Sequence, residues 1–448
     1  MSVPKLALSP ISGKSRIAVL DIMRGIAILA IFFMNLPFMG YPGTELLSDP
    51  RYLGWTSSDQ FVFAFNHIFL DGTQRCLLEF LFGAGMMILT KRAMAPDGPV
   101  AVADVYMRRT MWLMVFGLVD LYGLLWRGDI LFTYAFAALF LLPFRRLTPR
   151  WLLLLGSVFA IYQGLLSWSS YSEQVNLATQ VELAHQHGVH GTLTDSDRMV
   201  MREWNNLKRD YSLHPDDEFK QKTATEDSAH AHGYFSYANY VAPLLTKGFF
   251  TLRYTWIASG EAFFTMLLGM ALWKWGILQG ERSSRFYGLT ALIAYSIGLS
   301  LRAESVVHVF AFSPVADWTP ITSELARLAV GLGHLGLINW AVQTRAGWNL
   351  LAPFRAPGRM AFSIYFCQQI IGMHILFSPY GLNLWERLDW AQIQSIAFLV
   401  SAVILIASNI WLRYFAMGPL EFVWRSLTYL KLQPFRQPWV ACDTQPVA

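Results

Sequence analysis

Long apolar stretches alternate with short charged ones along most of this 448-residue chain. About 20 consecutive apolar residues suffice for a helix to cross the hydrocarbon core of a bilayer. The pattern therefore predicts an all-α polytopic membrane protein with about ten transmembrane helices. We place these helices at residues 17–39, 74–90, 108–126, 129–145, 150–169, 255–275, 286–303, 321–342, 359–378 and 391–413.

One long stretch, residues 170–248, breaks the apolar pattern. It holds 11 acidic and 7 basic residues and six of the ten histidines. We expect it to form one large extracytoplasmic loop between two transmembrane halves, 1–169 and 249–430, with a cytoplasmic tail at 431–448. The candidate active site described below falls in the first half.

Lys and Arg are distributed unevenly between the connections. If the N-terminus is cytoplasmic, the inner segments hold 20 of the 35 Lys and Arg, and the short outer loops hold only four. Basic residues collect on the cytoplasmic side of membrane proteins. The distribution therefore predicts that both termini are cytoplasmic.

The composition agrees with a membrane location. Hydrophobic residues make up 54% of the chain and charged residues 15%, whereas soluble domains carry about 25% charged residues. This excludes a soluble enzyme, a disordered chain and a fibrous one. The net charge of +5 is explained by basic cytoplasmic loops and does not indicate a nucleic-acid partner. The three cysteines are far apart and suggest neither a disulfide framework nor a metal site.

Charged residues interrupt the first apolar segment at Asp21 and Arg24. Three residues apart, they share one face of a helix and can neutralise each other. Two interpretations stay open. The pair could fix the helix near the cytoplasmic interface, or it could help to bind an anionic group that enters from the cytoplasm.

A denser polar cluster lies at the outer entrance of the second apolar segment. His67 and Asp71 are four residues apart, and Arg75 and Glu79 follow. A helical turn would bring His67 and Asp71 together, and a carboxylate bonded to one imidazole nitrogen leaves the other free as a base or nucleophile. The alternative is a polar helix end without a catalytic role.

Further ionisable residues occur at a short outer hairpin and inside apparent spans. Asp129 follows Arg127-Gly128 and could belong to a site or could cap the next helix, a position that favours Asp. Arg327 and His334 are two helical turns apart and could face one lumen or simply pack. The histidines of the polar segment lack the spacing of a helical metal site, so we expect no metal.

Several motifs together resemble the bacterial YeiB-like membrane family. They occur in the family's order and cover nearly the whole chain outside 170–248. The motifs are Arg16–Ala27 ending in Met34-Asn35, Phe80–Gly85, Gly128–Leu131 followed by Tyr134-Ala135, Gly358–Ala361, Gly418–Glu421 and Trp424–Tyr429.

The family in turn is similar to a superfamily of transmembrane acyltransferases that includes heparan-alpha-glucosaminide N-acetyltransferase. The shared features are an Asp-x-x-Arg-Gly opening and a His four residues before an Asn/Asp-Gly pair, here His67 and Asp71-Gly72. By this resemblance His67 corresponds to the catalytic histidine. Asp71 departs from the asparagine of that relative, which changes the charge beside His67.

The resemblance implies transfer of an acyl group from cytoplasmic acyl-CoA, with acetyl-CoA as the expected donor, to an extracytoplasmic sugar or envelope component. His67 would be the base or a transient acyl carrier, and Asp71 or Asp129 would orient it. The implied substrate-binding residues are Asp21, Arg24, Asn35, Arg75 and Glu79. The implied CoA-binding residues are Arg92, Arg108, Arg109 and Arg359.

A transporter or flippase for a small anionic or lipid-linked substrate is the alternative, since buried charges can also line a translocation path. A non-catalytic scaffold would leave His67 and Asp129 unexplained. The family resemblance places the chain in the bacterial inner membrane, where a homodimer is possible.

Overall fold

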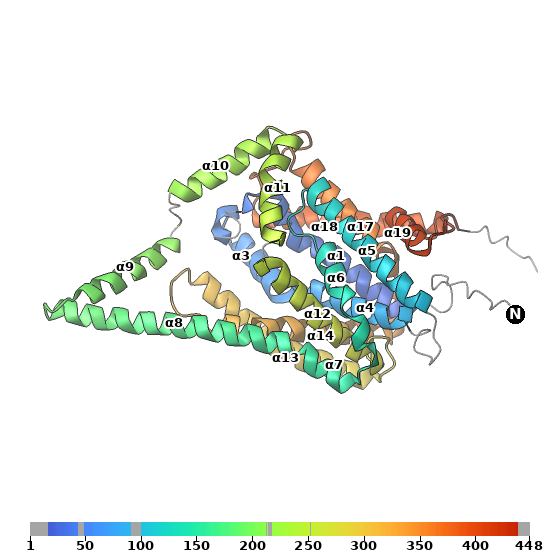
Figure 1. The fold of residues 1–448 in the computed structure, drawn as a ribbon, viewed down its shortest axis with the longest axis horizontal. Helices are drawn as coiled ribbons and strands as arrows, with labels where there is room; N and C mark the ends of the chain where they lie inside the picture. The colour runs from blue at the N-terminus through green and yellow to red at the C-terminus, as the bar shows by residue number, and fades with distance from the viewer. Residues whose placement is uncertain are drawn as a thin grey trace, which may run out of the picture.

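A computed structural model describes residues 17–43, 49–90, 100–211, 213, 217–250 and 252–437. Every regular element in these ranges is helical, and one isolated β-bridge joins Phe415 to Arg436. Most helices lie side by side in one bundle, and α9 and α10 lie beyond one of its ends (Figure 1). The predicted all-α architecture is confirmed for this part of the chain.

Six helical segments are long and apolar enough to cross a membrane. They are α1 (Ala18–Gly40), Pro149–Val189, Trp256–Lys274, α13 (Ser284–Phe310), Thr319–Val342 and α18 (Trp390–Tyr414). The second comprises α7 (Pro149–Gly156) and α8 (Val158–Val189), the third lies in α12 (Leu252–Lys274), and the fifth includes η6 (Thr319–Thr322) and α14 (Ser323–Val342). Each covers a segment predicted to span.

The other four predicted spans are helical but shorter or less apolar. They correspond to α4 (Thr73–Thr90), α5 (Val100–Gly123), α6 (Leu131–Leu139) and α17 (Ala361–Gln369), which the π-helical turn η8 (Ile370–Leu376) continues. The segment predicted at 129–145 is interrupted because Pro143 begins the 3-10 turn η5 (Leu142–Arg146), and proline cannot donate a helical hydrogen bond. Arg75 and Glu79 lower the apolar character of α4.

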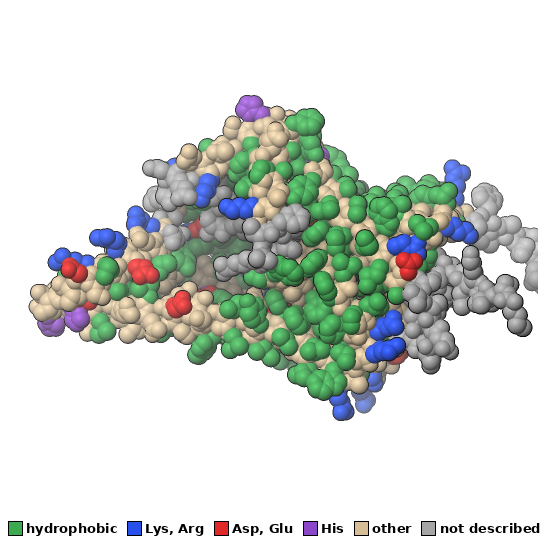
Figure 2. Space-filling model, viewed as in Figure 1, with side chains coloured by type: hydrophobic (Ala, Val, Ile, Leu, Met, Phe, Trp, Pro, Cys, Tyr) green, Lys and Arg blue, Asp and Glu red, His purple; other side chains and the backbone are tan. Residues whose placement is uncertain are grey.

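The outward faces of several long helices are apolar. Leu292 and Ile293 of α13 and Phe398 and Ile406 of α18 are exposed. Hydrophobic side chains cover the middle of the molecule in Figure 2, and Lys and Arg lie mostly on both sides of it, toward α9 and toward the end that carries α19 (Pro419–Tyr429). An exposed apolar belt of this kind fits contact with lipid. The protein is therefore a helical membrane protein.

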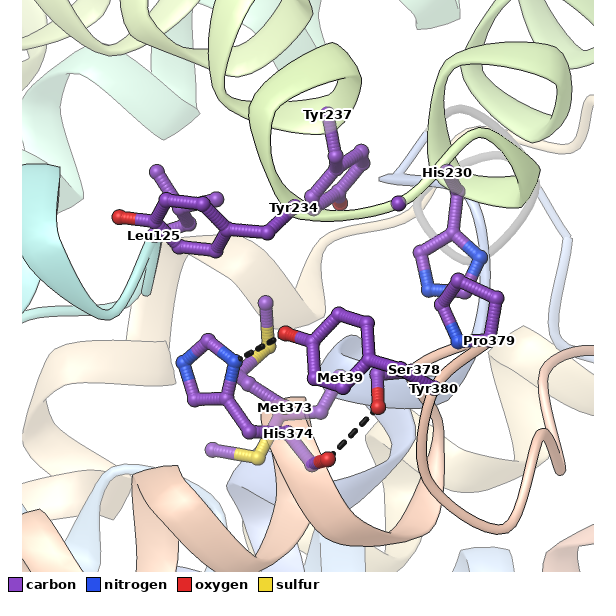
Figure 3. Close-up of a pocket in the computed structure, with 11 residues that line it drawn as sticks. Met39, Leu125, His230, Tyr234, Tyr237, Met373, His374, Ser378, Pro379 and Tyr380 are labelled. Carbon is purple, nitrogen blue, oxygen red and sulfur yellow. Dashed lines mark hydrogen bonds between the residues drawn. The ribbon is translucent and has the colours of Figure 1, made fainter.

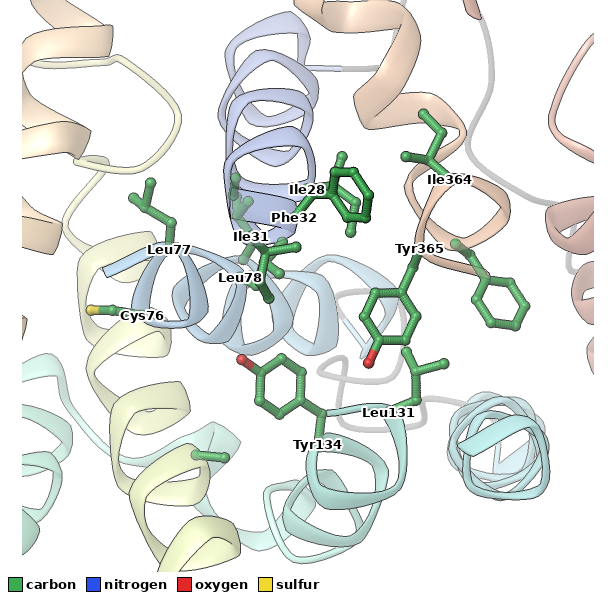
Figure 4. Packing of buried hydrophobic residues seen from close by; sticks show 14 of the residues in the cluster. Ile28, Ile31, Phe32, Cys76, Leu77, Leu78, Leu131, Tyr134, Ile364 and Tyr365 are labelled. Atoms are coloured by element: carbon green, nitrogen blue, oxygen red, sulfur yellow. The ribbon is translucent and has the colours of Figure 1, made fainter. Parts of the chain in front are cut away.

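Helix α1 runs through the centre of the bundle. Gly25 of α1 lies against the backbone of Phe354, and a Cβ on Gly358 would come within 1.8 Å of the Asp21 carbonyl oxygen. Larger residues would separate α1 from the turn that holds Gly358. Further along α1, Ile28, Ile31 and Phe32 lie near Leu77 and Leu78 of α4 (Figure 4).

Shorter elements complete the chain. At the α9 end lie η2 (Pro50–Leu53), α3 (Ser57–Phe65) and the π-helical turn η3 (Asn66–Leu70). The connection from α14 to α17 contains α15 (Arg345–Leu351), η7 (Ala352–Phe354) and α16 (Arg355–Arg359).

The polar connection 170–248 is largely helical. Helix α8 continues without a break from Val158 to Val189, so the expected boundary at residue 169 falls inside it. Helices α9 (Asp195–Asp210), α10 (Asp217–Ala231) and α11 (Tyr234–Phe250) follow and lead back to the bundle (Figure 1). Capping explains in part why this segment is helical, because Thr194 and Asp197 form a reciprocal capping box at the start of α9.

Polar contacts attach α10 to the bundle. The guanidinium of Arg127 is bonded to the buried carboxylate of Glu226. The indole nitrogen of Trp385 donates to Asp227 at 3.0 Å, and the ring of His230 stacks on Trp385 with centroids 4.0 Å apart.

Candidate functional site

His67 lies on the turn η3, which follows α3 directly and precedes α4. Its ring stacks on Phe63, with centroids 4.3 Å apart. Arg302 of α13 fixes the backbone of the turn, because its guanidinium donates to the carbonyl oxygens of His67 at 2.6 Å and Asp71 at 2.7 Å. Two charge-assisted bonds to one turn limit its conformations.

The side chains of His67 and Asp71 are close, as their spacing predicted. Nε2 of His67 is 4.0 Å from a carboxylate oxygen of Asp71, and both side chains are partly exposed. This is an ion-pair distance when the imidazole is protonated and is too long for a hydrogen bond. The sequence suggested an ordinary helical turn, whereas the turn here is π-helical, a geometry that often occurs at functional sites.

A buried cluster of charges lies beside this turn. Arg327 of α14 contacts Glu324 at 2.7 Å, Glu79 of α4 at 3.1 Å and Glu261 of α12 at 3.3 Å. Arg75 also contacts Glu261, at 3.3 Å. We call these five residues the Arg327 cluster. It brings together the predicted site residues Arg75 and Glu79 and joins α4, α12 and α14.

An apolar cavity lies beside η3. Its volume is about 390 Å³, and Leu70 of η3 forms part of its wall. The other lining residues come from α1, α4, α13, α14 and α15: Ile26, Ala30, Gln74, Leu77, Tyr295, His334, Leu337, Ile338, Ala341, Leu350 and Leu351. Leu70 follows His67 by three residues on the same turn.

Asp129 lies apart from this arrangement. Its carboxylate accepts from the backbone N–H groups of Leu131 at 3.0 Å and Phe132 at 2.7 Å, so it caps the start of α6. Its neighbour is Asp120, which is also buried. Within the described ranges no hydrogen bond or ion pair joins Asp129 to His67. The geometry thus favours Asp71, rather than Asp129, as the carboxylate that faces the imidazole.

The predicted residues of α1 lie elsewhere in the bundle. Arg24 contacts Asp21 at 3.2 Å and donates to the carbonyl oxygen of Gly358 at 3.3 Å. This is the helix-fixing role considered for the pair. Asn35 is half-buried in the second half of α1. Neither part of α1 contributes a charge to the Arg327 cluster.

The predicted CoA-binding arginines are not gathered at one point. Arg92 lies outside the described residues. Arg108 pairs with Asp104 at 2.7 Å, the guanidinium of Arg109 lies over the ring of Trp424, and Arg359 donates to the carbonyl oxygen of Ala416 at 2.9 Å. Arg109 and Arg359 therefore have structural contacts of their own.

Several groups at the site could not be assigned from sequence. Arg302 and Tyr295 carried no motif, and Gln74 appeared only as one polar residue in the cluster that follows His67. The charges of Glu261 and Arg327 inside apolar segments were the one available signal. Charges in such segments need partners, but the sequence does not say which helices pack together.

A second hollow lies beneath α11. It has a volume of only about 20 Å³ and is lined by His230, Tyr234, His374 and Tyr380, among others (Figure 3). The hydroxyl of Tyr380 is 2.7 Å from Nδ1 of His374. This space suits about one water molecule, so it is too small for a substrate.

The fold and the site define a polytopic helical membrane protein with a buried charge cluster and an apolar cavity. Residues 272–431 match a family described as a protein of unknown function, DUF418. That region includes Arg302, Arg327 and His334, and His67 lies before it.

Similarity to individual proteins extends over nearly the whole chain. The uncharacterized protein YxaH of Bacillus subtilis is 28% identical and covers 96% of this chain and 98% of its own length. The uncharacterized protein YeiB of Escherichia coli is 26% identical, and the similarity covers 91% of this chain and 95% of YeiB. Over nearly its whole length the chain is therefore similar to YxaH and YeiB, which is the resemblance that its motifs predicted.

Replacing Arg327 with Met should destabilise the protein strongly. Three glutamates would lose their shared guanidinium, and breaking a buried ion pair costs about 3–5 kcal/mol. The matched control is Arg108→Met, which breaks a partly exposed pair worth about 0–1 kcal/mol. Thermal unfolding of the two variants in one detergent measures the difference. Equal losses of stability would contradict a central role for the cluster.

Docking of α10 should weaken in acid. Burial lowers the pKa of His230 from 6.5 to about 4. Undocked His230 gains a proton below about pH 6.5 and the docked residue only near pH 4, so stability is lost as the pH falls between these values. Hydrogen exchange of residues 217–231 at pH 7.5 and pH 5 measures this.

His230→Phe keeps a flat ring on Trp385 and should remove the pH effect. The exposed neighbour His232 provides the control, because His232→Phe should retain it. If both variants keep the pH effect, another group is responsible.

Proposed function

We propose that this protein is a transmembrane acyltransferase that moves an acyl group from acyl-CoA to a hydroxyl or amine of an extracytoplasmic sugar or envelope component. The observation that carries the proposal is the position of His67. Its ring is partly exposed, and Leu70 of the same turn lines a large apolar cavity. An acyl group in this cavity would lie one helical turn from a base.

The shape of the cavity suits a donor that arrives from the α19 end. Along α14 its wall runs from His334 to Ala341, a length of about 10 Å at the helical rise per residue. It then reaches Leu350 and Leu351 of α15, and α16 follows with Arg355 and Arg359. Guanidinium groups are good ligands for the phosphates of CoA, while an apolar passage suits the acyl end.

The chemistry at His67 follows from its neutral imidazole. In a direct reaction His67 takes the proton of the acceptor O–H or N–H, the acceptor atom attacks the carbonyl carbon, and the carbon–sulfur bond breaks to release the CoA thiolate. The thiolate then takes the proton. In a two-step reaction the imidazole nitrogen itself receives the acyl group first. In both, Asp71 stabilises the positive charge that develops on the ring.

This function requires a defined orientation. We propose ten membrane crossings with both termini in the cytoplasm of a bacterium, so that α9 and α10 lie outside the inner membrane. Two findings support this arrangement: α19 and α9 lie at opposite ends of the molecule (Figure 1), and the basic residues are concentrated in the segments assigned to the inside.

Labelling of single cysteines tests the orientation. In a variant without native cysteines, Thr192→Cys near α9 should react with a membrane-impermeant maleimide in intact spheroplasts. Ser283→Cys, at the start of α13, should react only after the membrane is opened. Both residues are exposed, so the reverse pattern would exclude this topology.

Loss of His67 should abolish acyl transfer. Purified protein is incubated with radiolabelled acetyl-CoA, and label transferred to water, acceptor or protein is counted. His67→Ala should reduce the rate by about 100-fold or more, since a general base contributes about 10²–10⁴. His308→Ala is the matched control, because His308 lies at the end of α13 and pairs with Glu304 and Asp317. Equal rates in the two variants would contradict the proposal.

A transporter or flippase remains the second candidate, and the Arg327 cluster is the observation that favours it. Buried ionisable residues in membrane proteins often line substrate or proton paths, and the neighbouring carboxyl groups of Asp120 and Asp129 are buried as well. A transporter would work without acyl-CoA and would respond to an ion gradient in proteoliposomes. Failure of acetyl-CoA and of longer acyl-CoAs as donors would move this candidate to first place.

A further inference from the structure

The side chain of Gln74 is buried with half of its hydrogen-bonding capacity unused. The residue is 4% exposed and lines the apolar cavity. Its carbonyl oxygen accepts from the hydroxyl of Thr73 at 2.6 Å. Its amide nitrogen, in contrast, has no hydrogen-bond partner among the described residues. This amide nitrogen is thus available to a ligand in the cavity.

The other polar side chains of the cavity wall are satisfied by the protein. The hydroxyl of Tyr295 donates to Nδ1 of His334 at 2.6 Å, and Nε2 of His334 is 3.0 Å from the carbonyl oxygen of Phe69. Each nitrogen of this imidazole therefore has a partner. The N–H of Gln74 is the polar group of the wall that remains available to a ligand.

The contacts of His334 join three elements at the end of the cavity where its lining along α14 ends. Nε2 of His334 lies near the hydroxyl of Thr73 as well, at 3.3 Å, so the start of α4, η3 and α14 are held together beside Gln74. None of the described residues that line the cavity is charged. An occupant that reaches Gln74 can therefore pair with it through an uncharged hydrogen-bond acceptor.

We propose that Gln74 donates a hydrogen bond to the carbonyl oxygen of the acyl thioester, and that the acyl group is short because the cavity ends there. The inference rests on the proposed function and names its donor as a short-chain acyl-CoA that enters from α15. A carbonyl is uncharged and accepts hydrogen bonds, as the unpaired N–H requires. Longer chains would have to pass the contacts of His334.

This placement would also assist the reaction. Negative charge develops on the carbonyl oxygen when the acceptor attacks the carbonyl carbon. A fixed donor in a site with little water stabilises that charge more than it stabilises the neutral thioester. Gln74 would then contribute both to binding of the donor and to the transition state.

The test compares two ligands that differ in the carbonyl oxygen. Affinities of acetyl-CoA and of S-ethyl-CoA, the thioether without that oxygen, are measured by titration calorimetry on the full chain in nanodiscs. The wild type should bind acetyl-CoA about 3- to 10-fold more tightly than S-ethyl-CoA, because one neutral hydrogen bond contributes about that much to affinity. Gln74→Met, which keeps the length of the side chain, should bind both equally, with unchanged affinity for S-ethyl-CoA.

A bulky residue tests whether the cavity is the place of binding. Ala341→Trp fills the wall near α15 and should abolish binding of both ligands. Ala407→Trp on the exposed face of α18 is the control and should bind like the wild type. The wild type should bind palmitoyl-CoA no more tightly than CoA itself. Tight binding of palmitoyl-CoA, or its displacement by phospholipid, would show a site for long lipid chains and overturn the inference.

The inference and the proposed function can fail separately. Equal affinities of the wild type for acetyl-CoA and S-ethyl-CoA would overturn the role of Gln74. His67-dependent transfer that proceeds at the wild-type rate in Gln74→Met would overturn it as well, while the acyltransferase assignment would stand. A Gln74-dependent preference for acetyl-CoA without any His67-dependent transfer would support the binding site and reject the catalytic role of His67.

Discussion

The Arg327 cluster is the constraint on which the arrangement of the other helices depends. Charges within a membrane are expensive unless they are paired, and Arg327 is joined to carboxylates on α4 and α12 as well as on its own helix. These contacts fix three helices at one depth. They also fix the turn after η3, because a Cβ on Gly72 would lie 2.9 Å from the side chain of Arg327. Gly72 has a φ of +68°, which glycine adopts readily.

Next to that fixed point, the turn η3 carries both parts of the site. It holds His67, and its Leu70 lines the apolar cavity, while Arg302 binds the backbone of the turn through the carbonyl oxygens of His67 and Asp71. The proposed roles of His67 and Gln74 both depend on the short distance along the chain between these residues.

Helices α9 and α10, which lie beyond the end of the bundle, form a separate part of the structure. They are joined to it through Arg127, Asp227 and the stacked pair of His230 and Trp385. These contacts are few and polar or aromatic, unlike the continuous apolar packing around α1. The docking of this part of the chain is therefore where we expect a response to pH, through His230. The family model covers only residues 272–431, so α8–α11 and η3 lie outside the region it matches.

The sequence by itself determined that the protein is a helical membrane protein, that it resembles YeiB-like proteins and that His67 lies close to Asp71. These depend on local properties, namely apolar length and short helical spacing. Only the tertiary structure decided that Arg327 of α14 meets Glu79 and Glu261, that Asp129 caps α6, and that Gln74 faces a cavity. The polar composition of residues 170–248 predicted a connection between two membrane-spanning halves but not its helical form, which requires only backbone hydrogen bonds and suitable caps. Partners that are hundreds of residues apart are set by packing, which no local pattern encodes.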